Sequence, residues 1–102
     1  MYRCWILALG LFACGRSADD VQAEFEDVIA ESNSCAEATD CVVIFPGCPL
    51  GCAATINAAN KATVEAKAQE LIDDYERGGQ SCAYGCMQTG SPVCEQQRCK
   101  LP

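Results

Sequence analysis

The sequence predicts an α+β domain in which two helices pack on a small antiparallel sheet of about three strands, with disulfides holding the elements together. Two observations favour this fold class. Ten cysteines in 102 residues are typical of small exported domains whose bridges supplement a thin core. The periodic segments follow one another as helix, strand, helix, strand and strand, and three strands covered by helices suffice for a sheet.

The first 13 residues have the pattern of an export signal. Met1-Tyr2-Arg3 is a short positive start, and an apolar run follows from Cys4 to Phe12. This run is far shorter than the ~20 residues that a helix needs to span a bilayer. We therefore predict a signal peptide over residues 1–13 rather than a transmembrane anchor.

The tetrapeptide Leu11-Phe12-Ala13-Cys14 resembles the lipobox of bacterial lipoproteins, and the whole chain is similar in type to small cysteine-rich members of that group. The resemblance implies that Cys14 is lipidated, becomes the new N-terminus and attaches the chain to a membrane. It implies a lipid-anchored protein of the bacterial cell envelope, exposed to the periplasm or the exterior, and in the outer membrane if the source is Gram-negative. The alternative, ordinary cleavage nearby, would leave an odd cysteine, whereas lipidation leaves eight that can all pair.

Residues 14–34 are predicted to form a lipid-anchored segment with an acidic amphipathic helix. Ser17-Ala18-Asp19-Asp20 has the pattern of a capping box, and Ser32-Asn33-Ser34 ends the apolar periodicity. Four apolar residues share one face of this helix, namely Val21, Phe25, Val28 and Ile29. Such a face is what packing on a small core requires, so we favour a packing helix over a recognition helix or an acidic spacer.

Residues 35–102 are predicted to form the disulfide-rich domain, with its best strand at the start. Cys41 to Phe45 is rich in β-branched and aromatic residues and stops at Pro46-Gly47. Alternation places Cys41, Val43 and Phe45 on one face and Val42 and Ile44 on the other. Because both faces are apolar, we expect a central strand that is covered on both sides.

The alanine-rich stretch from Ala53 to Arg77 is predicted to be one long helix between two similar cysteine pairs. Thr55 or Asn57 can cap its start, and Gly78-Gly79 supplies a residue at which helices commonly stop. The apolar stripe consists of Ile56, Val64, Ala68, Leu71 and Tyr75. The opposite, charged face consists of Lys61, Glu65, Lys67, Glu70, Asp73, Asp74 and Glu76.

Two further short strands are expected after this helix. Ser81 to Met87 and Pro92 to Leu101 are the candidate segments, joined by a turn at Thr89-Gly90-Ser91. Within the second segment, Cys94 to Cys99 could itself form a small turn.

The eight remaining cysteines are predicted to form four disulfides with an open connectivity, because eight cysteines allow 105 pairings. They are Cys35, Cys41, Cys48, Cys52, Cys82, Cys86, Cys94 and Cys99. Their symmetry about the helix suggests that both helix ends are tied to strands. A zinc-binding Cys4 module built from Cys48, Cys52, Cys82 and Cys86 is the alternative, and a redox pair at Cys48 and Cys52 is a third hypothesis. We expect disulfides and no metal or cofactor, because exported thiols are oxidised.

Charge and composition argue against several function classes. Fourteen acidic residues stand against seven basic ones, so binding to nucleic acid is disfavoured. The chain has no histidine, no glycine-rich phosphate loop and no Ser-His-Asp set, so we expect no enzyme. The prediction is a non-enzymatic binding or structural module for a protein or glycan partner. The alternative is a small protease inhibitor whose exposed loop, such as Gln88 to Val93, occupies a protease cleft.

Overall fold

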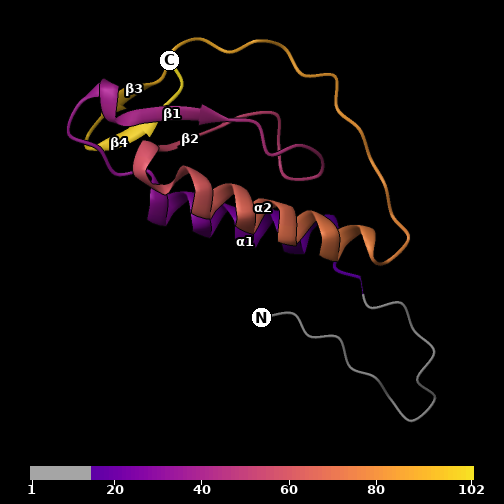
Figure 1. The fold of residues 1–102 in the computed structure, drawn as a ribbon. Helices are drawn as coiled ribbons and strands as arrows, with labels where there is room; N and C mark the ends of the chain where they lie inside the picture. The colour runs from indigo at the N-terminus through magenta and orange to yellow at the C-terminus, as the bar shows by residue number, and fades with distance from the viewer. Residues whose placement is uncertain (1–14) are drawn as a thin grey trace.

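The computed structural model describes residues 15–102 and has the predicted α+β, disulfide-rich fold (Figure 1). Two α-helices, two short 3-10 helices and four strands follow one another within these residues. In order they are α1 (Ala18–Ser32), the 3-10 helix η1 (Ala38–Asp40), β1 (Cys41–Ile44), β2 (Ala54–Asn57), the 3-10 helix η2 (Ala58–Asn60), α2 (Lys61–Glu76), β3 (Val93–Glu95) and β4 (Arg98–Lys100). The predicted signal peptide and Cys14 lie outside the described residues.

The strands form two separate antiparallel pairs rather than one sheet of about three strands. β1 pairs with β2, and Cys41 lies opposite Asn57. β3 pairs with β4 around a turn at Gln96 and Gln97, whose positive φ angles let the chain reverse within two residues. Contacts between β2 and β4 bring the two pairs together.

The helices lie side by side in opposite directions and cover one face of the β1–β2 pair (Figure 1). The core is the set of buried side chains between these layers: Val21, Phe25, Ile44, Ile56, Val64, Ala68, Leu71 and Tyr75. All five residues of the apolar stripe predicted for 53–77 are therefore buried. Helix α1 supplies Val21 and Phe25 and packs Val28 and Ile29 against the same core, as predicted.

The long helix predicted from Ala53 is wrong in its first part. Residues Ala54–Asn57 form β2, and α2 begins only at Lys61. Asn57 does cap a helix, because its side chain accepts a hydrogen bond from Ala59 N, but that helix is η2. Thr55 lies in β2, and its hydroxyl donates to Cys99 O at 2.9 Å. The alanine-rich composition could not reveal this strand because pairing with β1, not local propensity, stabilises it.

Three strand predictions also need correction. No strand forms at Ser81–Met87, because this segment has no partner strand. Pro92–Leu101 is a hairpin, β3–β4, so the turn noted between Cys94 and Cys99 is present. β1 is a strand as predicted but not a central one, since it pairs on one side only and Phe45 beyond it is 65% exposed.

Helix α1 begins as the sequence indicated, with one difference. Ser17 Oγ accepts a hydrogen bond from Asp20 N at 3.1 Å, which caps the helix. The Asp20 carboxylate contacts the Arg16 guanidinium at 2.6 Å instead of returning to the Ser17 backbone, so the capping box is only half formed. Within residues 15–102, neither α-helix is long and apolar enough to cross a membrane.

Candidate recognition surface

All eight cysteines in the described part of the chain form disulfides, as predicted. Two bridges tie the β3–β4 hairpin to the start of the domain, and two tie the loop of residues 45–53 to the segment after α2. The four bridges are Cys35–Cys94, Cys41–Cys99, Cys48–Cys82 and Cys52–Cys86. In the chain-entropy model a bridge that closes a loop of 34 to 59 residues contributes about 4 kcal/mol when taken alone.

The two Cys-x-x-x-Cys pairs bond to each other, which contradicts the expectation that the helix ends are tied to strands. Cys48 pairs with Cys82 and Cys52 with Cys86, each across 34 residues. This pairing is geometrically accessible because β2 carries the chain away from Cys52 and α2 returns it in the opposite direction. A straight helix from Ala53 to Arg77 would have held the pairs ~35 Å apart.

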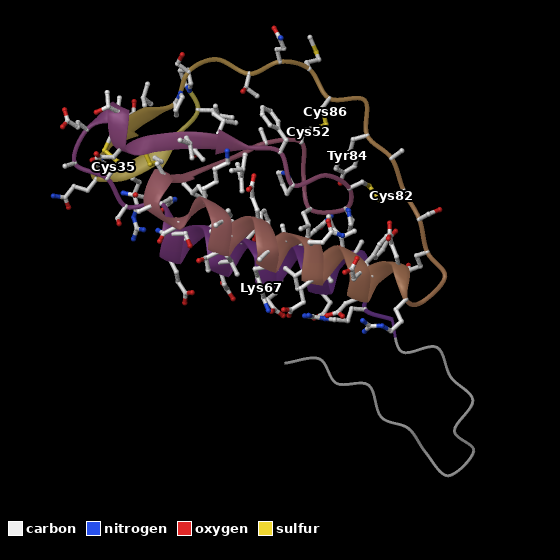
Figure 2. All side chains as sticks on the ribbon, in the orientation of Figure 1. Cys35, Cys52, Lys67, Cys82, Tyr84 and Cys86 are labelled. Atoms are coloured by element: carbon white, nitrogen blue, oxygen red, sulfur yellow. A yellow bond between two sulfur atoms is a disulfide. The ribbon has the colours of Figure 1, made fainter. Side chains whose placement is uncertain are left out.

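Residues 78–92 form a connecting segment without regular secondary structure, which we call the strap. It leaves the end of α2 and arcs over the loop of residues 45–53 to reach β3 (Figure 1). Cys82, Tyr84 and Cys86 all contact that loop, and the Tyr84 hydroxyl donates to Pro49 O at 3.1 Å (Figure 2). Alternate side chains of an extended chain point the same way, so Ala83 and Met87, which are both exposed, are directed outward.

After its first two residues, Gly78 and Gly79, whose backbone N–H groups donate to the end of α2, the strap is held by side chains and not by its backbone. From residue 80 to residue 92, no backbone group makes a backbone hydrogen bond to any other described residue. Besides its two disulfides and Tyr84, the strap is attached at Gln80, whose side chain donates to Arg16 O at 3.2 Å. Its peptide groups therefore remain available to solvent or to a partner.

The strap differs from the rest of the chain in charge and exposure. No charged residue occurs from Gly78 to Cys94, although 21% of the whole sequence is charged. The large exposed apolar side chains of the described residues lie on or beside the strap: Phe45 is 65%, Tyr84 45% and Met87 86% exposed. Phe45 and Met87 line one hollow of about 480 Å³ with Cys86, Gln88 and Thr89.

A charged network joins the two helices. Lys67, on the helix layer that faces away from the strap, contacts Glu24 of α1 at 2.8 Å (Figure 2). Arg16 contacts the same Glu24 carboxylate at 2.6 Å. Hydrogen bonds lower the pKa of the Glu24 carboxyl, with the larger effect from Lys67 and the smaller from Arg16. The hydrogen bonds to Asp20 and Glu24 raise the pKa of Arg16, despite partial burial. The acidic and basic side chains of this network are paired with one another, so it links the two helices and is not a candidate catalytic group. We call the ion pairs of Arg16 and Lys67 with Glu24 the clasp.

The zinc alternative named the wrong cysteines. The two strap bridges already contain all four of these cysteines, namely Cys48, Cys52, Cys82 and Cys86. The sulfurs that gather within 4.8 Å of one another are instead those of Cys35, Cys41 and Cys99. Because a coordinating cysteine must be a thiolate, this group can bind a metal only if its bridges are reduced. The redox hypothesis is also not supported, since Cys48 and Cys52 are not bonded to each other.

The sequence indicated part of this surface and missed part. The predicted inhibitor loop, Gln88 to Val93, lies in the strap and at the first residue of β3. Phe45 was assigned to a covered strand face, and Tyr84 and Pro49 were given no role. The spacing of Cys82, Tyr84 and Cys86 at every second residue was the available signal, and it indicates an extended segment anchored on one side.

Comparisons of this chain with protein-family models, with curated proteins and with solved structures found no match. Its function is therefore inferred from the strap and from the residues around it.

Proposed function

We propose that this chain is a lipid-anchored, non-enzymatic binding module of the bacterial cell envelope, and that the strap is its recognition surface. One observation carries the proposal: a long uncharged segment is largely exposed to solvent yet fixed by two disulfides. Ordering a flexible loop on binding costs free energy, and the two bridges remove much of that cost in advance.

The composition of the strap favours a protein over a glycan as partner. The central part of a protein interface is depleted of charges and enriched in tyrosine, phenylalanine and methionine. Tyr84, Met87 and the neighbouring Phe45 are of these types and are exposed. The Tyr84 hydroxyl is directed inward to Pro49, so this side chain offers a partner its ring rather than its polar group.

The residues after Cys14 support an anchor that holds the body close to the membrane. Arg16 N donates to Asp74 O at 3.2 Å, and its guanidinium contacts Asp20, Glu24 and Asp74. Gly15 packs against Gly78 at the end of α2. Since these contacts begin directly after the predicted lipidated residue, little free chain separates the lipid from the folded body.

Partner binding is tested by placing a photo-crosslinking amino acid at Ala83, which faces outward on the strap, and at Ala66, which is exposed on α2. We expect position 83, but not position 66, to cross-link one envelope protein that can be identified by mass spectrometry. The purified partner should then bind the wild-type chain and lose affinity for a Met87→Ala variant. Equal labelling at the two positions, or none at either, would contradict recognition by the strap.

Anchoring is tested independently by metabolic labelling with an alkyne fatty acid in a bacterial host, followed by intact-mass analysis. We expect label on a product that begins at Cys14, and no label on a Cys14→Ser variant. A product that begins elsewhere, or an unmodified Cys14, would show that the chain is exported without a lipid.

A further inference from the structure

We infer that the strap is the inhibitory loop of an endopeptidase inhibitor. In this inference Met87 enters the S1 pocket of the protease, the pocket that holds the side chain before the scissile bond. The inference rests on the proposed function, because it assigns a partner class to the same recognition surface. That partner is an endopeptidase that forms an acyl-enzyme and prefers an apolar residue in S1.

The backbone of the strap suits a protease cleft. An extended polypeptide can pair with an exposed strand edge through main-chain hydrogen bonds while alternate side chains enter pockets. Residues 80–92 leave their peptide groups without backbone partners among the described residues, so this pairing requires no bond to break. Their inward side chains are already fixed, as Cys82 and Cys86 are in disulfides.

The side chain that enters the S1 pocket is identified by exposure. Met87 is 86% exposed, more than any other large apolar residue described, and it directly follows the anchored Cys86. An unbranched apolar side chain suits the hydrophobic S1 slot of a chymotrypsin-like enzyme and not a slot that carries an aspartate. The absence of charge from Gly78 to Cys94 agrees with this specificity.

The bridges explain why the strap would inhibit a protease instead of being consumed by it. In the cleft, the enzyme nucleophile would attack the Met87 carbonyl carbon, the bond to Gln88 N would break, and the enzyme general acid would protonate the leaving amine. The Met87 side of the cut stays tied through Cys86–Cys52, and the Gln88 side stays tied through Cys94–Cys35. The amine therefore cannot diffuse away, and its high effective concentration favours re-formation of the peptide bond.

The test measures inhibition of chymotrypsin, subtilisin and trypsin by the full chain with all four bridges formed. We expect inhibition of chymotrypsin or subtilisin below about 1 µM and none of trypsin. Met87→Ala should weaken inhibition at least ~10-fold, because an apolar pocket loses most of its contacts. Met87→Lys should transfer inhibition to trypsin, and Ala66→Lys, which adds the same charge on α2, should leave the wild-type profile unchanged.

A second variant tests the role of the bridge. Cys52→Ser with Cys86→Ser should turn the strap into a substrate that is cut after Met87 within minutes, while circular dichroism shows the helices intact. The inference is overturned if the wild-type chain inhibits no enzyme with an apolar S1 pocket, or is cut rapidly without inhibiting it. It is also overturned if both Met87 variants inhibit as the wild type does. Cross-linking at Ala83 to a partner that is not a protease would reject the inhibitor assignment while leaving the binding module in place.

Discussion

At the scale of single residues, Gly15 and Gly78 let the backbones at the two helix ends approach closely. A Cβ built on Gly15 would collide with the Gly78 backbone, and one built on Gly78 would lie 3.1 Å from Gly15 Cα. The approach allows Arg16 to bond Asp74 O and to place its guanidinium among three carboxylates. Two glycines therefore bring the start of α1 to the end of α2.

Gly15→Ala should destabilise the fold by about 1–3 kcal/mol, because the added methyl group forces the two backbones apart. Gly85→Ala is the matched control, since a Cβ at Gly85 has no described atom within 4 Å. Urea unfolding measures both variants. A Gly15→Ala protein as stable as the Gly85→Ala protein would show that the close approach is not required.

Glu24 gives the fold a defined dependence on acid. Hydrogen bonds from Lys67 and Arg16 hold the pKa of its carboxyl below the ordinary value of 4.5. A carboxyl whose pKa is lower in the folded state stabilises the fold fully above its unfolded pKa, and this contribution is lost as the pH falls through the folded pKa. Glu24→Gln should cost about 1 kcal/mol at pH 7 and flatten the loss of stability below pH ~4.5.

The control for this prediction is Glu26→Gln, because Glu26 is exposed and makes no ion pair with a described residue. Unfolding is measured between about pH 3 and pH 7 for both variants. Parallel curves for Glu24→Gln and wild type would mean that the clasp contributes nothing to the acid response.

At the scale of elements, Asn57 marks the point where the chain turns from β2 into the helices. Its Oδ1 accepts from Ala59 N at 2.9 Å and its Nδ2 donates to Ser34 O at 2.9 Å. Asn57→Ala should lower the free energy of unfolding by about 1–2 kcal/mol, because both the cap and the hydrogen bond to Ser34 are lost. Asn57→Asp keeps the acceptor and loses only the donor, so urea unfolding should rank it between wild type and Asn57→Ala. An equal cost for both would assign the whole effect to the bond with Ser34.

Local periodicity was sufficient to predict α1, β1 and the whole of α2, although the predicted helix began eight residues too early. Ser17, Val21 and Phe25 act as the sequence indicated, since capping and burial of one face are local properties. β2 was missed because Ile56 lies eight residues before Val64, a spacing that also fits a helical stripe. Only the long-range pairing of Val42 with Ile56 resolves the ambiguity, and local periodicity does not show such pairing.

The candidate site was predictable in its parts but not in its assembly. The eight cysteines and the loop from Gln88 to Val93 followed from the sequence, whereas the bridge pattern did not, because 105 pairings are equivalent in sequence terms. The exposure of Phe45 depends on β1 having a partner on one side only. The exposure and the anchoring of the strap are visible only in the folded structure.

At the scale of the whole molecule, the bridges differ in accessibility. Cys41 and Cys99 are 7% and 2% exposed within the domain, whereas Cys82 and Cys86 are exposed on the strap. Within residues 15–102 the core consists of eight buried side chains, so a domain of this size depends on its bridges for stability. Cys48–Cys82 and Cys52–Cys86 hold the strap to the loop of residues 45–53, and the other two bridges join the second strand pair to the rest of the domain.

Reduction under native conditions should therefore proceed in two stages. A thiolate reductant reaches exposed sulfurs first, so Cys48–Cys82 and Cys52–Cys86 should open while the helices and both strand pairs persist. Opening of Cys41–Cys99 should follow together with loss of helical circular dichroism, because that bridge is buried beside the core. Timed alkylation with mass mapping, run in parallel with circular dichroism, measures the order. Loss of helicity with the first two bridges would show that the strap also supports the core. Release of all four bridges in one step would show that the domain has no stable partly reduced form.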